Sequence, residues 1–494
     1  MLKFINLLAN TARKVCFLTI SKINKNALKL ILVWVIVLSI LYSTLSILRH
    51  NHFQSGGFDL GLYDQAAWQY SRFLNPYNTI KERYILGDHL NLTLPLLAPL
   101  FWLWDNVRML LIFQAFWISF SSLAIYKLCR LRKFSPLTSL NLSFIYSLFY
   151  GIQQAVFFDF HPVVIGVGLL AWVAYFLESG KTKPFIITLV LLLATQENMG
   201  IALAGLGLIY LFQKKYRRVA LGFIIGGFIW SFLAAKIIAS FSPIGFQYWP
   251  KISFNPLKIL TDFFNAEEKR LTFLYSFSWF SFLPLLSPGA ILAVFLDLSQ
   301  YFITGSEFAR MWSPFMHHRA ILAPFLLLGT LDALKFLNKK GIKPQNVSII
   351  IVIIAVAFQY FFHFPLNKLS KPIYWREEPW MADNRAMIAT IPPEASVATQ
   401  QSLAPYLSHR KEIYLVYPRQ HDFDNKPCGQ ISCWWLDFGG KPEYLVVDLH
   451  PYQWLTQLLE SNENFESAIN NMEKAGKIRL EKEVNDAKLY RIIY

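Results

Sequence analysis

Long apolar stretches, separated by short polar segments, recur up to about residue 362 of this 494-residue chain. Most are close to the ~20 residues that a helix needs to cross the hydrocarbon core of a bilayer. The pattern therefore predicts a mainly α-helical, polytopic transmembrane bundle over residues 27–363, after an N-terminal segment at 1–26. Eleven spans are expected, and the shorter stretches leave this count open by about one or two. The spans are 27–47, 107–128, 137–156, 163–177, 185–195, 201–212, 219–241, 271–286, 290–302, 320–336 and 347–362.

After residue 366 the pattern changes to short alternating strands and amphipathic helices, which is typical of a small α/β domain over 366–494. Strands are expected at 396–399, 412–416, 443–448 and 488–493, and helices at 454–460 and 465–475. Cys428 and Cys433 lie in this domain and can form a disulfide across a short loop. Zinc is the weaker alternative, because a second pair of ligands is missing.

The composition agrees with a membrane protein, because 54% of the residues are hydrophobic and only 16% are charged, against about 25% charged in soluble domains. The net charge of +16 comes largely from basic residues that gather between alternate spans. This distribution predicts a cytoplasmic N-terminus and an extracytoplasmic C-terminal domain in a multi-pass cell-membrane protein, and it argues against nucleic acid as a partner. The basic residues are Lys3, Arg13, Lys14, Lys22 and Lys25, then Lys127, Arg130, Arg132 and Lys133, then Lys181 and Lys183, then Lys214, Lys215, Arg217 and Arg218, and finally Lys339, Lys340 and Lys343.

Ionisable residues gather on the opposite, outer side of this topology. A first outer loop at about 49–105 holds several of them, and three further connections hold the others. Ionisable groups near membrane depth are costly, so their convergence on one face predicts a functional site. The candidates are Asp59, Asp64, Asp88, His89, Asp159, His161, Glu197, Asn198, His318 and Arg319.

These residue types fit the transfer of a group from a lipid phosphate. Asp59 or Asp64 is expected to be the catalytic general base towards an acceptor hydroxyl or amine. Arg319, with the histidines before it, suits a phosphate leaving group, because a guanidinium donates two parallel hydrogen bonds. The remaining candidates are expected to bind or orient substrates. An apolar groove between helices would hold a polyprenyl tail. No spacing requires a metal ion, although a divalent metal held by Asp and His is conceivable.

Structural roles compete with each functional role. Asp59 can be the N-cap of a helix over 60–73, and Asp64 can belong to a solvated face. Asp88–His89 can be a loop pair, Asp159 and His161 can end a helix, and His317-His318-Arg319 can be an interfacial anchor. Asp64 lies about one and a half turns after Asp59, so the two are expected to project to different sides.

Several motifs resemble one family. They are FDLGLYDQAAW at 58–68, ILGDHLNLTLPLLAPL at 85–100, FDFHP at 158–162, TQENMG at 195–200 and MADNRAMIATIPPEASVATQQSLAPYLSHR at 381–410. They resemble the polytopic membrane family known as domain of unknown function 2079. Its layout is similar to the GT-C glycosyltransferases, such as protein mannosyltransferases and the aminoarabinose transferases of lipid A.

This resemblance implies an acid in the first outer loop and a polyprenyl-phosphate sugar as donor. Those enzymes often carry Asp-Glu followed by an aromatic residue, whereas this chain has Asp64-Gln65 with Trp68 close behind. Either Asp59 supplies the missing carboxylate or the chemistry differs from that of those enzymes.

Three functions are compatible with the sequence. The expected one is a GT-C-like glycosyltransferase that moves a sugar from a polyprenyl-phosphate donor to a lipid, glycan or protein acceptor outside the cytoplasm. A lipid or solute transporter is a weaker alternative, since no internal repeat is found and the charges lie at one face. A non-catalytic envelope scaffold is the third, and it would tolerate replacement of the acids.

Overall fold

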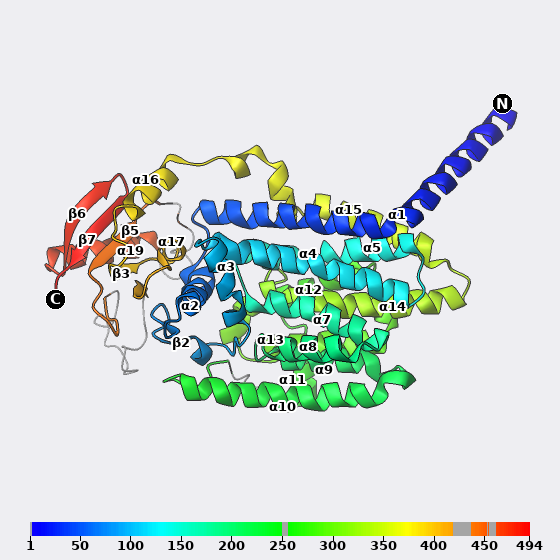
Figure 1. The fold of residues 1–494 in the computed structure, drawn as a ribbon, viewed down its shortest axis with the longest axis horizontal. Helices are drawn as coiled ribbons and strands as arrows, with labels where there is room; N and C mark the ends of the chain where they lie inside the picture. Colours follow the sequence, from blue (N-terminus) through cyan, green and yellow to red (C-terminus); the bar gives the residue numbers. More distant parts are fainter. Residues whose placement is uncertain (1, 249–254, 418–435, 452, 454–460) are drawn as a thin grey trace.

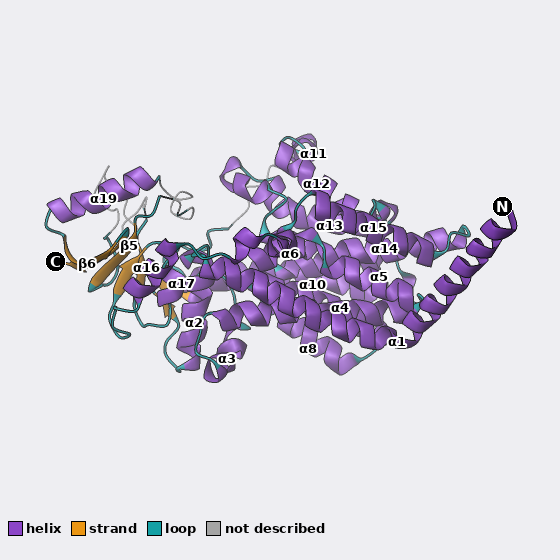
Figure 2. Cartoon of the chain, turned by 90° about the horizontal axis from the view of Figure 1, so that it is seen from above, coloured by secondary structure: helices purple, strands orange, loops and turns teal. Residues whose placement is uncertain are grey.

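The computed structural model describes residues 2–248, 255–417, 436–451, 453 and 461–494, with only the backbone given for 2–21 and Glu307. The disulfide expected between Cys428 and Cys433 and the helix expected at 454–460 lie outside the described residues. A bundle of helices forms most of the molecule, and a sheet domain lies at one of its ends (Figures 1 and 2).

The bundle is built from helices that run side by side (Figure 1). The first, α1, continues beyond the bundle towards the N-terminus. The bundle helices are α1 (Leu2–Asn51), α4 (Arg108–Leu131), α5 (Pro136–Ser147), α6 (Tyr150–Phe158), α7 (Pro162–Ser179), α8 (Thr182–Leu193), α9 (Met199–Leu211), α10 (Arg217–Phe241), α11 (Pro256–Asp262), α12 (Glu267–Trp279), α13 (Pro288–Phe302), α14 (Leu322–Lys339) and α15 (Pro344–Phe361).

Each expected span coincides with one or two helices, so the mainly α-helical transmembrane fold is confirmed. Within the described part of the chain, six helical stretches are long and apolar enough to cross a membrane, and shorter apolar helices accompany them. The six are Lys22–Asn51, Arg108–Leu131, Pro162–Ser179, Lys214–Phe241, Phe308–Lys339 and Pro344–Phe361.

Two expected spans are interrupted. The span at 137–156 divides into α5 and α6, because the backbone at Phe149 is extended; the Gln153 side chain donates to the Leu148 carbonyl that the break exposes. The span at 271–286 ends early, since Phe282 has a positive φ and a short turn with Pro284 follows it. Proline does not continue a helix interior.

The first outer loop forms a layer over one end of the bundle. A tight helical turn, Gly57–Gly61, leads directly into α2 (Leu62–Ser71). A short antiparallel ladder of β1 (Tyr77–Asn78) and β2 (Arg83–Tyr84) and the helix α3 (Ala98–Leu103) complete this layer.

The C-terminal domain contains a five-stranded sheet of order β4-β3-β5-β7-β6. The pairs β3–β4 and β3–β5 are parallel, and the pairs β5–β7 and β6–β7 are antiparallel. Its elements are α16 (Pro379–Ile388), β3 (Val397–Thr399), α17 (Ala404–Leu407), β4 (Ile413–Leu415), β5 (Tyr444–Asp448), α19 (Asn462–Lys474), β6 (Ile478–Val484) and β7 (Ala487–Ile492).

The four expected strands correspond to β3, β4, β5 and β7, and the helix expected at 465–475 corresponds to α19. The edge strand β6 was not expected, because it carries charged residues and is mostly exposed. Charged side chains are common on edge strands, where they discourage pairing with other chains.

Candidate functional site

The turn before α2 places Asp59 at the end of the bundle that meets the C-terminal domain. Two contacts hold this turn against the C-terminal domain: the backbone N–H of Gly57 donates to the Gln401 carbonyl (3.0 Å), and that of Phe58 donates to Gln401 Oε1 (3.0 Å). Gly57 has no room for a side chain, since a Cβ there would lie 2.8 Å from Leu415 and 2.9 Å from Ala404. The tight packing fixes where the carboxylate of Asp59 points.

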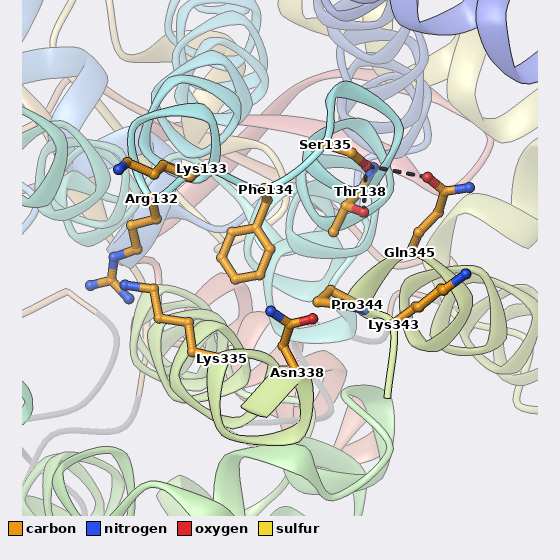
Figure 3. A pocket seen from close by; sticks show the side chains of 10 residues that line it. All are labelled: Arg132, Lys133, Phe134, Ser135, Thr138, Lys335, Asn338, Lys343, Pro344 and Gln345. Carbon is orange, nitrogen blue, oxygen red and sulfur yellow. Dashed lines mark hydrogen bonds between the residues drawn. The ribbon is translucent and has the colours of Figure 1, made fainter. Parts of the chain in front are cut away.

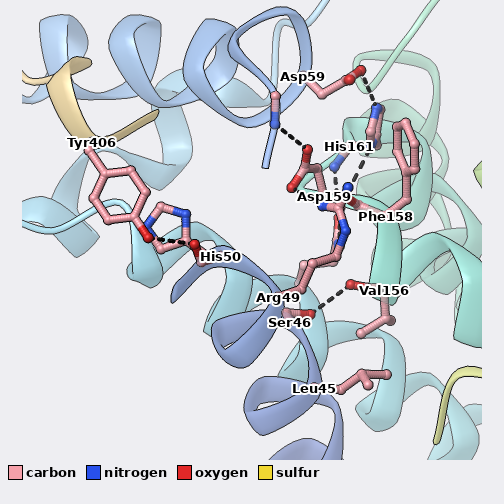
Figure 4. Close-up of polar contacts among 12 residues, drawn as sticks. Leu45, Ser46, Arg49, His50, Asp59, Val156, Phe158, Asp159, His161 and Tyr406 are labelled. Carbon is pink, nitrogen blue, oxygen red and sulfur yellow. Dashed lines mark hydrogen bonds and ion pairs between the residues drawn. The ribbon is translucent and has the colours of Figure 1, made fainter. Parts of the chain in front are cut away.

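Asp59 is paired with a histidine from the start of α7. His161 Nε2 donates to Asp59 Oδ1 at 3.0 Å (Figure 4), and 32% of the Asp59 side chain is exposed. Burial acts to raise the pKa of Asp59, but the His161 hydrogen bond and the charges of His161, Arg49 and Lys81 outweigh it and hold the pKa below its ordinary value. Asp59 is therefore an ionised carboxylate that a neighbouring group can reach.

A buried ion pair lies directly behind this carboxylate. Arg49, near the end of α1, contacts Asp159 Oδ1 at 2.6 Å, and both side chains are almost completely buried. Gly56 donates its backbone N–H to the other oxygen of Asp159 (2.9 Å; Figure 4). Burial raises the pKa of Asp159 to about 6, although Arg49 opposes the rise. Asp159 thus connects α1, α6 and the turn that carries Asp59.

A row of ring contacts extends from His161, with His161 and His317 stacked and the later pairs tilted. The ring centroids of His161 and His317 are 3.8 Å apart, and those of His317 and His318 are 4.0 Å apart. His318 in turn lies 5.4 Å from the ring of Tyr301. The expected convergence of His161 and His318, which are 157 positions apart in the numbering, is therefore present in the folded chain.

Asp88, His89 and Glu197 form a second polar group. His89 Nδ1 donates to Glu197 Oε1 at 2.7 Å, and the backbone N–H of Leu90 donates to Glu197 Oε2 at 3.3 Å. The Tyr248 hydroxyl donates to Asp88 Oδ1 at 3.2 Å. Burial acts to lower the pKa of His89, but the charges of Glu197 and Asp88 prevail and raise it.

Lys81 and Tyr63 join the two groups. Lys81 Nζ lies 3.5 Å from Asp88 Oδ1, and its charge also lowers the pKa of Asp59. Tyr63 is buried between them: burial, followed by the charges of Asp88, Tyr248, Asp59 and Glu197, raises its pKa well above the ordinary value. One polar site therefore contains both groups. The sequence analysis did not predict four residues of this site: Lys81, Tyr63, Tyr248 and Gln401. Only Lys81 had a signal in the sequence, because it is the one lysine in a loop rich in acidic residues.

Asp64 faces away from this site. Its side chain is completely buried under the C-terminal domain, where the Ser408 hydroxyl donates to Asp64 Oδ2 at 2.5 Å. His409 lies between two carboxylates, with Nε2 at 3.0 Å from Asp64 and Nδ1 at 2.9 Å from Asp105. The expected divergence of Asp59 and Asp64 is thus observed, and Asp64 has the contacts of a docking residue.

His409 makes this docking sensitive to pH. Burial acts to lower the pKa of His409, but Asp64 and Asp105 raise it from 6.5 to about 9. Protonated His409 therefore stabilises the folded protein by up to ~3 kcal/mol. This contribution is fully present below about pH 6.5 and is lost as the pH rises through 9. We expect the unfolding temperature of the purified protein to fall across this window, and His409→Gln to abolish most of that slope.

The exposed His363 provides a matched control. His363→Gln should keep the wild-type pH slope. Equal slopes in wild type and His409→Gln would contradict the role of His409.

Arg319 and Asn198 occupy the inner edge of the site. Arg319 is completely buried, and its guanidinium donates to the carbonyl groups of Met311 and Ser313, the latter at 3.2 Å. Its Nη1 and the Asn198 Oδ1 have no hydrogen-bond partner among the described residues. Arg319 is not an exposed interfacial anchor, because it lies inside the protein and orders the loop that precedes it.

The N-cap alternative for Asp59 is wrong, because no side chain caps α2 or the turn before it and Asp59 pairs with His161 instead. Among the described residues, no group of three or more His, Cys, Asp or Glu side chains is arranged to hold a metal ion.

The helix bundle and the C-terminal sheet together have an ArnT-like fold. The structure resembles ArnT from Cupriavidus metallidurans in the apo state, with a TM-score of 0.53 and 12% identity, over 94% of this chain and 98% of that chain. It also resembles that protein bound to undecaprenyl phosphate, with a TM-score of 0.51 and 13% identity, over the same shares of the two chains. At these identities the likeness establishes the fold alone.

Residues 49–470 match the family described as "Predicted membrane protein (DUF2079)", and the chain belongs to that family. Both resemblances drawn from the sequence are thereby confirmed. No curated protein matches the sequence.

Proposed function

We propose that this protein is a glycosyltransferase that moves a sugar from a polyprenyl-phosphate donor to an acceptor outside the cytoplasm. One observation carries the proposal: a partly exposed, ionised Asp59 is held by His161 at the outer end of a GT-C-like bundle. A carboxylate in this state can accept a proton from an acceptor hydroxyl or amine. The likeness to a structure that binds undecaprenyl phosphate supports the class of donor.

In the proposed reaction the acceptor attacks the anomeric carbon of the donor sugar. Its proton passes to Asp59, on the oxygen that does not contact His161, while the bond between that carbon and the phosphate oxygen breaks. The polyprenyl phosphate leaves with the bonding electron pair. His161 keeps the Asp59 carboxylate oriented, and the buried Arg49–Asp159 pair fixes the turn behind it. General base catalysis of this kind contributes about 10²–10⁴-fold to a rate.

Lys81 is the cation proposed to contact the leaving phosphate. It lies between Asp59 and Asp88 and keeps 20% of its side chain exposed. Arg319, whose partners are the carbonyls of its own loop, would hold that loop and keep His318 in the site. His89, Glu197 and Asn198 would bind the sugar or the acceptor from the opposite side of Tyr63.

The outer orientation of this site is part of the proposal. The basic connections of the chain lie at the other end of the bundle, which supports a cytoplasmic position for that end. The C-terminal domain would then be extracytoplasmic and would meet the acceptor. Asp64 is proposed to hold this domain in place through Ser408 and His409, while Asp59 performs the chemistry.

The test is a transfer assay. Purified protein would be incubated with a panel of radiolabelled polyprenyl-phosphate sugars and an envelope extract as acceptor, and donor binding would be measured separately. Consumption of one donor, with label appearing on an acceptor or as free sugar, is expected. Donor consumption from no member of the panel, together with no donor binding, would contradict the proposal and favour a scaffold.

Gln401 provides a second test, because it contacts the turn that carries Asp59 from the C-terminal domain. Gln401→Ala removes the acceptor of the Phe58 N–H, a bond of about 1 kcal/mol. We expect kcat to fall by roughly fivefold while donor Kd stays within about twofold. Ser402→Ala is the control, because its hydroxyl accepts from Gln400 inside the C-terminal domain. Equal kcat values for the two variants would contradict this positioning role.

A further inference from the structure

A basic pocket lies at the end of the bundle opposite the candidate active site. The α4–α5 and α14–α15 connections enclose about 300 Å³, and the lining side chains surround the ring of Phe134 (Figure 3). Lys133, Lys335 and Lys343 contribute to the lining, with Asn338 between them in the chain. No Asp or Glu residue lines the pocket.

Three of the four basic residues that line this pocket have no ion-pair partner among the described residues. Arg132 also lines it, but its guanidinium is paired with Glu178 at 2.5 Å and Asp332 at 3.2 Å. Among the described residues, no carboxylate lies within ion-pair distance of the three lysines. In Figure 3 the Lys335 ammonium lies beside the Arg132 guanidinium, whereas the ammonium groups of Lys133 and Lys343 point outward on opposite sides of the pocket. Two cations side by side in a basic pocket favour an anionic ligand, since their charges repel one another until a counter-charge binds.

The helix geometry adds to this preference. Both α5 and α15 begin at the pocket, with Pro136 and Pro344 in their first turns. The Asn141 side chain donates to the Ser348 hydroxyl at 3.1 Å, so the two N-terminal regions are fixed side by side. Helix N-termini carry a partial positive charge that favours phosphate and carboxylate groups.

The surroundings of the pocket indicate a lipid. Each lysine is within two positions of a large exposed apolar residue in the sequence. These residues are Leu131 before Lys133, Phe336 after Lys335 and Ile342 before Lys343, and they are 42%, 50% and 46% exposed. These side chains expose apolar surface within two residues of the lining lysines, at an end of the membrane-spanning bundle. A headgroup phosphate in the pocket would leave acyl chains against that surface, whereas a free phosphate ion would leave it uncovered.

We propose that this pocket binds the headgroup phosphate of an anionic phospholipid, from the leaflet at that end of the bundle. The site is independent of sugar transfer: it lies at the opposite end of the molecule from Asp59 and shares no residue with the candidate active site. An ordered lipid there would brace the α4–α5 connection against the α14–α15 connection.

Lipid retention by the full-length protein tests the proposal. Native mass spectrometry would count bound phosphatidylglycerol and phosphatidylcholine after both are added to purified protein. The pocket variant is Lys133→Gln/Lys335→Gln/Lys343→Gln. The control is Lys214→Gln/Lys215→Gln/Lys340→Gln, which removes equal charge at the same end of the bundle from residues that do not line the pocket. Inorganic phosphate alone would be a separate arm.

Wild type and control should retain phosphatidylglycerol in preference to phosphatidylcholine. The pocket variant should lose at least about tenfold of that retention, because each basic residue near an anionic lipid contributes about fivefold in binding. Equal retention by the pocket variant and wild type, or an equal loss in both triple variants, would overturn the proposal. Binding of inorganic phosphate without lipid would overturn the lipid assignment.

A single substitution makes the same test without removing a lysine. Asn338→Asp places a negative charge in the lining, and Asn346→Asp places the same charge on an exposed position that does not line the pocket. Reduced phosphatidylglycerol retention in Asn338→Asp alone is expected. If the triple pocket variant does not fold, the comparison of Asn338→Asp with Asn346→Asp tests whether the pocket binds the lipid. Equal retention by these two variants would then overturn the proposal.

Discussion

Asp59→Asn is expected to lower the rate of sugar transfer by about 10³-fold, within the 10²–10⁴-fold range of general base catalysis. The carboxamide keeps the size of the side chain and can still accept the His161 hydrogen bond, but it is not basic. Donor Kd should therefore stay within about threefold, so that the loss appears in kcat. The measurement is initial-rate kinetics with the donor identified in the panel, beside direct donor binding.

Asp64→Asn is the matched control for this experiment. Its carboxylate is completely buried and contacts Ser408 and His409, so the substitution should weaken docking of the C-terminal domain and lower the unfolding temperature. At a temperature where the variant remains folded, its kcat should exceed that of Asp59→Asn by at least about tenfold. Complete loss of transfer in folded Asp64→Asn, with activity retained in Asp59→Asn, would reverse the assignment of the base.

Arg49→Gln is expected to have the largest effect on stability. The substitution leaves the Asp159 carboxylate buried without its cation, and removal of one partner from a buried pair typically costs about 3–5 kcal/mol. The pKa of Asp159 is already about 6, so the loss should shrink below pH 6, where protonation removes the unpaired charge. Unfolding of the purified protein in detergent, followed against denaturant at pH 5 and about pH 7.5, measures both effects.

Arg72→Gln is the control for a pair on the surface. Arg72 contacts Asp105 at 2.5 Å, but their side chains are 43% and 44% exposed, and exposed pairs contribute about 0–1 kcal/mol. The double variant Arg49→Gln/Asp159→Asn should recover part of the lost stability, because no buried charge remains. Equal destabilisation by Arg49→Gln and Arg72→Gln would contradict the assigned importance of the buried pair.

The helix bundle could be predicted because its signal is local: an apolar stretch of sufficient length has few alternatives to a membrane helix. The break after Ser147 in the span at 137–156 could not be predicted. Both halves of that span are apolar, and only the extended backbone at Phe149 separates them. Similarly, the strand β6 carries no alternating pattern, because its position at the sheet edge leaves most of its residues exposed.

The site could be predicted in part. The topology correctly gathered Asp59, Asp159 and His161, because the ends of consecutive helices meet on one side of a bundle. The partners of the two acids in the first outer loop could not be predicted from the sequence. Asp64, for example, contacts residues that lie 344 and 345 positions later in the chain. The linking role of Lys81 was equally hidden, because it depends on its position between Asp59 and Asp88 in space.

The contact between the Asp59 turn and Gln401 has a consequence for synthesis. The turn is made early, but the residue that holds it lies in the last quarter of the sequence. Contacts of such large sequence separation form late in folding. A nascent chain can therefore insert all its membrane helices before the turn that carries Asp59 has its contact with Gln401. If the proposed sugar transfer depends on that contact, transfer would begin only after the C-terminal domain has folded against the bundle.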